Sequence, residues 1–518
     1  MKILGLSFGT HDSSYAIIED GKIVVHEELE RFSRIKECDG NVIDFYLDRH
    51  KSFDDIDIVT YFPHGNKKFY PSNFNILLEL AKNKIIDLYE VGHHQSHAAN
   101  AFFSSNFEEA LIVTLDGGGW DKTTNGLYAS QFTVWQGKDI KIEPKVLDGS
   151  WNPGVAWSKC TANVFGMCGG GPPYGCQAGT VMAMAAIGNS DKFYNELKDQ
   201  DIWGWNFHWE KYSNISEKDK FDFAATLQRL TEEKVRFELS KWITKDTKYL
   251  CLAGGTVLNS VMTGKLWDWF PHLVDIYIPP VPYDAGLAIG CAQFLSHHVL
   301  NFPRIKWRDN ASPYLGVTYT KEEVLTALNK YDNIIYKDSN DDHICDLLYN
   351  AKIVSVYGGP SESGRRALGN RSILADPTNP HMKDIVNEKV KHRQSFRPFA
   401  PSIIREEMNK WFTRDVNSPY MGFVLQFKKE VQDKVPAVVH VDGSARLQTV
   451  TEKDNKWYYN FLKKWQVKSG VPIILNTSFN DREPIVEKPE HAINCFLKTN
   501  IDYLYFFDYN ILVEKIKD

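Results

Sequence analysis

The chain opens with MKILGLSFGTHDSSYAIIEDGKIVVHE (residues 1–27), the stretch that decides the fold of its N-terminal part. Ile3–Leu6 is a short apolar run that predicts a buried strand, and Gly9–Ser14 predicts a turn. Tyr15–Glu19 and Ile23–Glu27 predict a hairpin in the same sheet, because short apolar runs bounded by turn residues are typical of strands. We therefore expect a sheet that begins with three adjacent antiparallel strands.

The same pattern recurs further along the chain. Leu111–Leu115 predicts a second apolar strand, which ends at Asp116 and three glycines, and Gly126–Trp135 predicts its partner. Two halves that each begin with a meander and continue into helices have the layout of an actin-like nucleotide-binding domain (ASKHA, duplicated RNase H-like). We predict an α/β fold with this domain over residues 1–310, in half-domains of about 1–105 and 106–310.

The remaining elements complete a two-domain prediction. Apolar spacing predicts a helix over Phe221–Thr244, strands over Tyr249–Ala253 and Val274–Ile278, and a closely packed Ala- and Gly-rich helix from Asp284. A length of 518 residues exceeds what one core normally organises. Residues 311–342 show no core pattern except a helix over Lys321–Leu328, so we expect a connecting segment there and a second α/β domain over 343–518.

Bulk composition excludes several classes of protein. A net charge of -6 argues against nucleic acid or a membrane surface as a general partner. No run of 18 apolar residues is present, so we expect no membrane span. Among the eight cysteines, the regularly spaced Cys160, Cys168 and Cys176 match neither a zinc knuckle nor a disulfide scaffold. The opening sequence lacks a signal h-region, so we expect reduced thiols and a cytoplasmic location.

An arginine-rich stretch, GRRALGNRSILADP (364–377), follows the apolar run Ile353–Tyr357. A strand that leads into such a turn offers backbone N–H groups and planar guanidinium groups to a multiply charged anion, such as a nucleoside triphosphate or an acyl phosphate. The alternative is a solvated basic loop.

Three further stretches strengthen the prediction of an anion pocket. They are NEKVKHRQSFRPFAP (387–401), HVDGSARLQTV (440–450) and VPIILNTSFNDREPIV (471–486), and each places polar groups beside apolar sequence. The last one has Asn476, Thr477 and Ser478 after the strand-like run Val471–Leu475, where loops of open α/β sheets tend to bind ligands. The basic groups that we expect in the pocket are Arg365, Arg366, Arg371, Lys391, His392, Arg393, Arg397 and Arg446.

A metal-like constellation occurs in the N-terminal half. HHQSHAANA (93–101) predicts a helix with His93 and His97 on one face, a spacing at which two imidazoles can bind one cation. Ordinary hydrogen-bonded histidines are the alternative. Asp116 ends a strand and Asp284 begins a helix, where an Asx-turn and an N-cap are the alternatives. A set of two His and two Asp suits Fe(II), Mn(II) or Zn(II).

Other candidates lie in the predicted turns. His11, next to Asp12, has an imidazole that can deprotonate a hydroxyl substrate, with a turn histidine satisfied by backbone as the alternative. The glycine turns Gly117–Gly119 and Gly254–Gly255 let backbone approach a phosphate closely, and Asn259 can meet a ribose or base edge.

Taken together, these residues resemble the O-carbamoyltransferase family of nodulation-factor and antibiotic-tailoring enzymes. The resemblance spans nearly the whole chain. It rests on GLSFGTHDSS, EELERFSRIK (27–36), HHQSHAA, LDGGG, LAGGTVLN, PYDAGLAIG and the series from RRALGNRSILADP to LNTSFNDREPIV. It implies an N-terminal actin-like domain, as in tRNA threonylcarbamoylation enzymes, and a C-terminal YrdC-like domain.

The resemblance also implies an activity. Carbamoyl phosphate and ATP, with Mg(II), form a carbamoyl adenylate in the YrdC-like part, and the actin-like part transfers the carbamoyl group to a hydroxyl, releasing AMP. It implies that a divalent metal of the Fe(II) type is held by His93, His97, Asp116 and Asp284, with His11 as candidate base. The implied phosphate and adenylate residues are Arg366, Arg371, Lys391, Arg393, Arg397, Arg446, Asn476 and Ser478, of which Lys391 and Arg397 are expected to act in catalysis. Asp12, Gly117, Gly118, Gly254, Gly255 and Asn259 are expected to bind the nucleotide.

The chain departs from the family pattern at Glu362–Arg366 and at Cys160–Ala178. We expect these differences to affect the shape of the acceptor cleft more than the carbamoylation chemistry. An amino sugar, a macrolide-type alcohol and a hydroxymethylated nucleoside or nucleotide all remain open as acceptors, and so does a homodimer. Four tryptophans can stack on a ring or belong to the core: Trp151, Trp157, Trp203 and Trp205. The rival functions are a small-molecule kinase, a tRNA-modifying threonylcarbamoyl fusion and a catalytically inactive nucleotide sensor.

Overall fold

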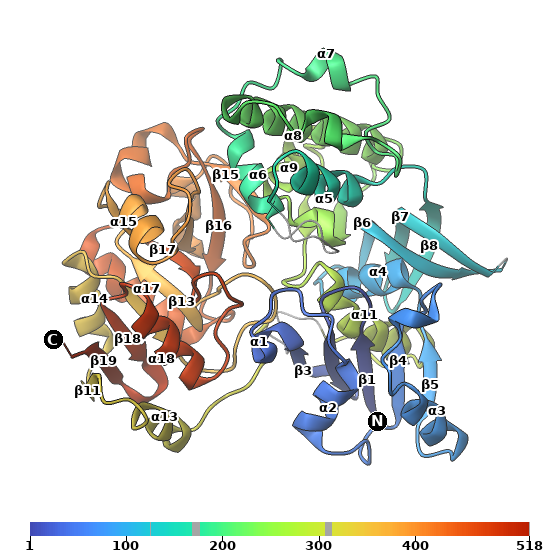
Figure 1. Ribbon diagram of the computed structural model, residues 1–518, viewed down its shortest axis with the longest axis horizontal. Coiled ribbons are helices and arrows are strands. Elements are labelled where there is room, and N and C mark those ends of the chain that lie inside the picture. Colours follow the sequence, from blue (N-terminus) through green and yellow to red (C-terminus); the bar gives the residue numbers. More distant parts are fainter. Residues whose placement is uncertain (125, 168–176, 306–312, 517–518) are drawn as a thin grey trace. The chain divides into compact units, whose positions relative to one another are not determined.

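The computed structural model describes residues 1–124, 126–167, 177–305 and 313–516 (Figure 1). The chain divides into two compact units, Met1–Ser312 (unit 1) and Pro313–Asp518 (unit 2). Each unit has its own sheets and its own buried core.

The first sheet of unit 1 has the strand order β3-β2-β1-β4-β5. β1 (Lys2–Ser7), β2 (Ser14–Glu19) and β3 (Lys22–Glu28) form the predicted antiparallel meander. β4 (Ile58–Tyr61) and β5 (Asp87–Glu90) continue the sheet in parallel on the other side of β1. Apolar side chains of α2 (Val42–His50) and α3 (Asn75–Lys82) complete the core on one face of this sheet.

The second sheet repeats this topology. Its order is β10-β9-β6-β7-β8, in which β6 (Glu109–Thr123), β7 (Gly126–Lys138) and β8 (Lys141–Asp148) are antiparallel. β9 (Tyr249–Ala253) and β10 (Asp275–Tyr277) are parallel to β6. Counted along the chain, the third, second, first, fourth and fifth strands are neighbours in both sheets. The predicted duplication is therefore confirmed, and it is consistent with an actin-like domain.

One strand boundary was predicted wrongly. β6 does not end at Leu115 but continues through Asp116 and the glycines to Thr123, with a shift of register between Leu115 and Gly119. The glycines form a bulge in the strand, because a residue without a Cβ tolerates the altered backbone, and β7 is long enough to pair on both sides of it. Asp116 therefore lies at a bulge and not at a strand end.

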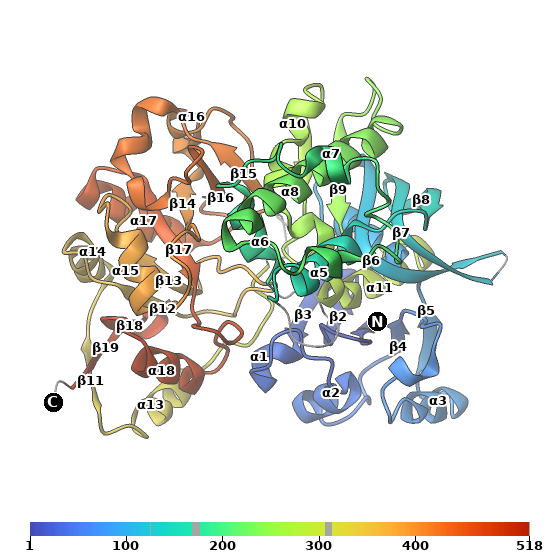
Figure 2. The ribbon, with the colours of Figure 1, turned by 45° about the horizontal axis from the view of Figure 1, so that its top comes forward.

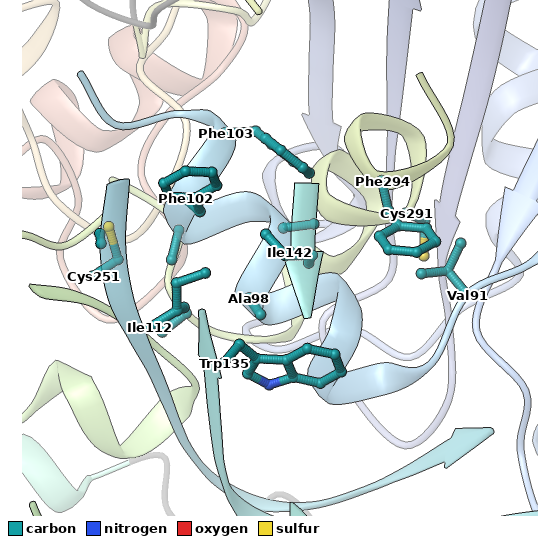
Figure 3. Packing of buried hydrophobic residues seen from close by; sticks show 14 of the residues in the cluster. Val91, Ala98, Phe102, Phe103, Ile112, Trp135, Ile142, Cys251, Cys291 and Phe294 are labelled. Carbon is teal, nitrogen blue, oxygen red and sulfur yellow. The ribbon is translucent and has the colours of Figure 1, made fainter. Parts of the chain in front are cut away.

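Two helices lie between the two sheets of unit 1. α4 (His93–Phe103) packs on β6 and β9, α11 (Leu287–Gln293) packs on β1 and β2, and the two helices contact each other. Figure 3 shows Ala98 and Phe102 of α4 on the side of Ile112 and Cys251 of the second sheet, with Cys291 and Phe294 on the side of α11. This shared core fixes the ends of α4 and α11 relative to both sheets.

Glycines permit the close approach of these layers. A Cβ on Gly290 of α11 would lie 1.9 Å from the carbonyl oxygen of Ser96 in α4, and a Cβ on Gly5 of β1 would lie 1.9 Å from that of Ala288. Real atoms cannot approach so closely, so the backbones meet only because both positions are glycine. The predicted close packing of this helix is confirmed.

The second half of unit 1 carries a group of helices between β8 and β9. These are α5 (Pro153–Asn163), α6 (Ala178–Ala185), α7 (Tyr194–Leu197) and α8 (Glu217–Ser240), which Figure 2 shows close together. α8 confirms the predicted helix and begins about one turn earlier, where the Ser216 hydroxyl caps it by accepting from the Asp219 N–H. Short helices follow β9: η3 (Gly255–Leu258), α9 (Ser260–Gly264) and α10 (Leu266–Trp269).

Unit 2 is built on one nine-stranded sheet, in the order β11-β19-β18-β12-β13-β17-β14-β16-β15. Its strands are β11 (Ile334–Asp338), β12 (Val354–Tyr357), β13 (Arg371–Ala375), β14 (Ala400–Ile404), β15 (Phe423–Gln426), β16 (Ser444–Val450), β17 (Ile473–Ser478), β18 (Tyr503–Phe506) and β19 (Ile511–Lys515). Its longer helices are α13 (Lys321–Leu328), α14 (Asp341–Tyr349), α15 (Met382–Lys389), α17 (Lys456–Ser469) and α18 (Pro489–Lys498). Phe461 and Trp465 of α17 pack with Ile344 of α14 against this sheet.

Two expectations about unit 2 need correction. Residues 311–342 are not only a connection, because β11 pairs with β19 along its whole length, so the second domain begins before residue 343. Asn476, Thr477 and Ser478 do not follow the strand but belong to β17, because all three pair with β13, and Asn476 also pairs with β14.

The structure also bears on the bulk predictions. None of the helices among the described residues is both long and apolar enough to cross a membrane. The six described cysteines are free thiols, and Cys168 and Cys176 lie outside the described residues.

Candidate active site

Four side chains of unit 1 converge, and they are the four that the sequence singled out as metal ligands. One ligand atom each from His93, His97, Asp116 and Asp284 lies within 4.8 Å of the other three. The shortest approaches are 3.2 Å from His93 Nε2 to Asp116 Oδ2 and 3.4 Å from His97 Nε2 to Asp284 Oδ1. Both histidines are buried.

Each ligand is positioned by its element. His93 is the first residue of α4 and His97 lies one helical turn later, so both rings point to the same side. Asp284 begins a short 3-10 helix, η4 (Asp284–Gly286), whose backbone is held against the first sheet. The Ser7 hydroxyl donates to the Asp284 carbonyl at 2.8 Å, and the Ser14 hydroxyl donates to the Ala285 carbonyl at 2.7 Å.

The structural alternatives for the two aspartates, an Asx-turn at Asp116 and a helix N-cap at Asp284, are not observed. Asp284 makes no capping hydrogen bond at the start of η4 or α11. Asp116 Oδ1 accepts from the distant Gly255 N–H at 2.7 Å and not from its own turn. Both carboxylates are therefore directed at the histidines by the tertiary structure.

The cluster fits a divalent cation. Among the described residues neither ring nitrogen of His97 has a hydrogen-bond partner, although the side chain is fully buried, and a buried polar atom is normally satisfied. Two carboxylates and two imidazoles supply a charge and a donor set that suit Fe(II), Mn(II) or Zn(II). Burial lowers the pKa of His93, but the charge of Asp284 and the hydrogen bond to Asp116 outweigh it and raise that pKa.

His11 lies at the edge of this cluster. Its Nδ1 is 2.9 Å from Asp12 Oδ2 and its Nε2 is 3.8 Å from Asp284 Oδ2. Burial lowers the pKa of His11, but the charge of Asp284 and the hydrogen bond to Asp12 raise it to about 10. Asp12 has a left-handed backbone, φ 57°, so its carboxylate orients the imidazole from the first turn.

The glycine turns adjoin the same cluster. Gly254 has φ +100°, and a Cβ there would lie 2.1 Å from the Leu115 carbonyl oxygen, so only glycine fits. At Gly117 and Gly118 a Cβ would meet no described atom closer than 3.4 Å, so lack of space does not require glycine at these two positions. Asn259 is different, because it caps α9 through the Met262 N–H and also donates to Gln228 at 2.8 Å. Its expected contact with a ribose or base stays a prediction.

Unit 2 contains a cluster of arginines whose positive charges lower one another's pKa. Burial lowers the pKa of Arg446, and the charges of Arg366, Arg393 and Arg397 lower it further. Burial and the charge of Arg397 also lower the pKa of Arg393, to about 9. The other three arginines are the charged groups that lower the pKa of Arg446, so four like charges lie close together in a partly buried site. Such a site favours an anion.

Three residues expected in the same pocket have their polar groups engaged inside unit 2. Arg371 is fully buried, stacks on the Tyr357 ring at 3.7 Å and donates to backbone carbonyls, among them that of Gly358 at 2.6 Å. Asn476 donates to the Ser402 hydroxyl at 3.0 Å and to Gln448 Oε1 at 2.9 Å. The Lys391 ammonium donates to carbonyl and amide oxygens of Ser478 and Asn480.

Family models match both units. A model described as Carbamoyltransferase N-terminus matches residues 64–293, and one described as Carbamoyltransferase C-terminus matches residues 345–515. The chain belongs to the carbamoyltransferase family. The enzyme class expected from the sequence is therefore confirmed, and the protein is a carbamoyltransferase.

Relatives of this carbamoyltransferase cover most of its length. An uncharacterized protein of Synechocystis sp. is 31% identical over 97% of this chain and 95% of its own. The Nodulation protein NolO of Bradyrhizobium diazoefficiens is 34% identical over 80% of this chain and 77% of its own. Among solved structures, the T. kodakarensis HypF crystal structure is 14% identical over 60% of this chain and 49% of its own, with a TM-score of 0.35, which is too low to support an argument.

Sequence reasoning missed several residues that shape the sites of this carbamoyltransferase. Gly119 was expected only to let backbone approach a phosphate, but it also leaves room for His93, because a Cβ there would lie 2.1 Å from the imidazole ring. Asn152 donates to the Gly117 carbonyl at 2.7 Å and so orients the glycine turn. Gln448 and Asn480 serve as partners of Asn476 and Lys391. No local sequence pattern marks such partners. Of the tryptophans considered for ring stacking, Trp151 and Trp157 are buried in the core, which was the alternative interpretation.

Proposed function

We propose that this carbamoyltransferase uses ATP and carbamoyl phosphate to form a carbamoyl adenylate in unit 2, a YrdC-like domain. Unit 1 then transfers the carbamoyl group to a hydroxyl of a small-molecule or nucleoside-type acceptor. The observation that carries the proposal is the presence of two chemically different sites, a four-ligand cation cluster and a cluster of four arginines whose charges oppose one another.

The arginine cluster supports the first half-reaction. Carbamoyl phosphate and MgATP are both multiply charged anions, and guanidinium groups bind phosphate oxygens through paired hydrogen bonds. Release of both phosphate and pyrophosphate requires one water molecule for balance. Water cleaves the bond from the carbamoyl group to phosphate, and a carbamate oxygen then attacks the α-phosphorus of ATP as pyrophosphate leaves. Arg366, Arg393, Arg397 and Arg446 stabilise the charge on the phosphates.

The roles within this pocket differ. Arg397 is the best candidate for direct contact, because no hydrogen bond or ion pair occupies its guanidinium among the described residues. Lys391 organises the loops around Ser478 and Asn480, and it reaches a phosphate only if it exchanges one of these partners. Arg371 and Asn476 support the sheet beneath the pocket.

Unit 1 supports the second half-reaction. The acceptor oxygen attacks the carbamoyl carbon, the bond from that carbon to the AMP phosphate oxygen breaks, and the acceptor proton passes to His11. A divalent metal held by His93, His97, Asp116 and Asp284, of the Fe(II) type, supplies Lewis-acid stabilisation of the charge that develops. The charges of Asp284 and Asp116 are among the causes that raise the pKa of His11, so a bound cation that offsets them would lower that pKa and leave the imidazole better able to accept the proton. The backbone of Gly117, Gly118, Gly254 and Gly255 binds the leaving AMP.

The experiment that tests this function is a product assay. Purified full-length protein receives ATP, Mg(II), Fe(II) and carbamoyl phosphate, and AMP and pyrophosphate are followed with and without candidate alcohols. Pyrophosphate release that depends on carbamoyl phosphate supports the proposal. Formation of ADP with an alcohol, and no response to carbamoyl phosphate, would instead support a kinase, which the duplicated fold of unit 1 also permits.

A further inference from the structure

The third histidine of HHQSHAANA has no part in the proposed reaction. His94 lies between the two predicted metal ligands in the sequence, and its ring centroid is 5.2 Å from that of His93 and 6.0 Å from that of His97. The side chain is fully buried. Whatever holds the His94 ring therefore also bears on the position of both ligands.

The second sheet holds both ring nitrogens of His94. Nε2 lies 2.8 Å from the Ser130 carbonyl oxygen of β7, and Nδ1 lies 2.6 Å from the Thr114 hydroxyl of β6. A carbonyl can only accept, so Nε2 carries a proton. A charged ring buried between two uncharged partners would be costly, so the neutral ring is favoured and its Nδ1 accepts from Thr114.

The bond from Thr114 belongs to a chain of hydrogen bonds across the sheet. Because Thr114 donates its hydroxyl proton to His94, its oxygen accepts from the Thr133 hydroxyl at 2.6 Å. Thr133 in turn accepts from Trp135 Nε1 at 2.6 Å. Thr114 and Thr133 are cross-strand partners in β6 and β7. Each donor of the chain has its acceptor, which fixes the orientation of the His94 ring.

A second contact holds the first turn of α4 on the other side of the bulge. The Gln95 N–H donates to Asp121 Oδ1 at 3.1 Å, and the Ser130 hydroxyl donates to Asp121 Oδ2 at 2.9 Å. Thr114 precedes Asp116 in β6 and Asp121 follows it. The helix is therefore tied to this strand on both sides of a predicted metal ligand.

The separation of α4 and β6 matters for a cation. His93 and His97 belong to α4 and Asp116 belongs to β6, so one ion can contact all three only if helix and strand keep a fixed separation. Bonds to such a metal are about 2.0–2.2 Å long, and a binding constellation tolerates errors of only about 0.5 Å. Apolar packing is non-directional, whereas the two hydrogen bonds of His94 are directional and join helix to sheet at this level.

We propose that His94 is a positioning residue of the cation cluster, an assignment that rests on the proposed function. Its two hydrogen bonds set the distance and the rotation of α4 relative to β6, so that His93 and His97 meet Asp116 with the geometry of a cation site. His94 does not bind the cation, because the sheet engages both of its nitrogens.

Thr114 permits a test that leaves every histidine and aspartate in place. Thr114→Val removes the hydroxyl at nearly constant volume. We expect the affinity of the full-length protein for Co(II) to fall about tenfold, with a changed visible absorption of the bound ion. Thr114→Ser restores the hydroxyl and should restore most of the affinity. Equal affinity in Thr114→Val and wild type, or an equal loss in Thr114→Ser, would overturn the inference.

Thr133→Val is the matched control. It removes a hydroxyl from the same chain of hydrogen bonds but leaves the bond from Thr114 to His94. Its free energy of unfolding in urea should fall by as much as that of Thr114→Val, since each leaves buried polar groups unpaired, whereas its Co(II) affinity should stay within about twofold of wild type. An equal loss of affinity in both variants would indicate a general structural effect and contradict the positioning role.

Failure of the proposed cation site has a different outcome. If wild-type protein does not bind Co(II), that site is wrong and the role of His94 is wrong with it. If wild-type protein and Thr114→Val bind Co(II) equally tightly, the site stands and only the role of His94 is wrong. His94→Phe, which keeps an aromatic ring but neither hydrogen bond, should lower the affinity at least as much as Thr114→Val, and normal affinity in this variant would also overturn the inference.

Discussion

Substitution of Gly119 by alanine tests the cation cluster without removing any ligand. The added Cβ would lie 2.1 Å from two ring atoms of His93 and 2.6 Å from its Cβ. Carbon atoms in contact are normally about 3.5–4.0 Å apart. The imidazole or the β6 backbone must therefore move by more than one ångström, and either movement takes His93 Nε2 away from Asp116.

The magnitude follows from the cost of such overpacking. Inserting a methyl group into a packed site costs about 1–3 kcal/mol. Because the strain falls on one of the four ligands, much of it is relieved only when the cation is released. We expect metal affinity to fall by about 10–100-fold, since each 1.4 kcal/mol is about a factor of ten. The free energy of unfolding of the metal-free protein should fall by no more than the overpacking cost.

Titration with Co(II), followed by its visible absorption, measures both the affinity and the ligand set. Gly117→Ala is the matched control, because a Cβ at that position meets no atom within 4 Å. This variant should bind Co(II) as wild type does. Unchanged affinity in Gly119→Ala, or the same loss in Gly117→Ala, would refute the assignment of His93 as a ligand.

Three further predictions concern the division of labour and the charges of the sites. Asp284→Ala should abolish carbamoyl transfer but spare carbamoyl-phosphate-dependent pyrophosphate release, and loss of both would contradict two separate sites. Arg397→Ala should stop pyrophosphate release; pyrophosphate at 100 times its Kd should stabilise wild-type protein by about 2.7 kcal/mol, and the variant by much less, relative to NaCl of equal ionic strength. In metal-free protein the folded-state pKa of His11 is raised from 6.5 to about 10, so the stability that its ion pairs contribute is complete below pH 6.5 and is lost as pH rises through 10. Urea titrations across this range should show a falling free energy of unfolding, His11→Asn should flatten the profile, and a wild-type profile that does not fall would contradict the ion pairs.

Much of the fold could be predicted because local patterns specify it. The opening meander, the second apolar strand and α8 have apolar periodicities that distinguish strand from helix. The continuation of β6 beyond Leu115 could not be read in this way, because it depends on pairing with β7 across the bulge. The same holds for β11, whose partner β19 lies at the other end of unit 2.

The candidate cation cluster was only partly accessible to sequence reasoning. His93 and His97 are four residues apart on a helix, so their common face follows from helical geometry. Asp116 and Asp284 are far apart in the chain, and only the packing of α4 against β6 and α11 brings them to the two histidines.

For this protein, the sequence by itself determined which kinds of ligand site to expect, while the tertiary structure decided which role each residue has in a site. The crowding of arginines predicted an anion pocket, because so much positive charge needs a counterion. Arg371 and Arg397 are the same amino acid in neighbouring motifs, yet backbone carbonyls surround the Arg371 guanidinium, whereas none of the described groups bonds that of Arg397. The physical reason is that a side chain's role depends on which partners reach it, and those partners come from distant parts of the chain.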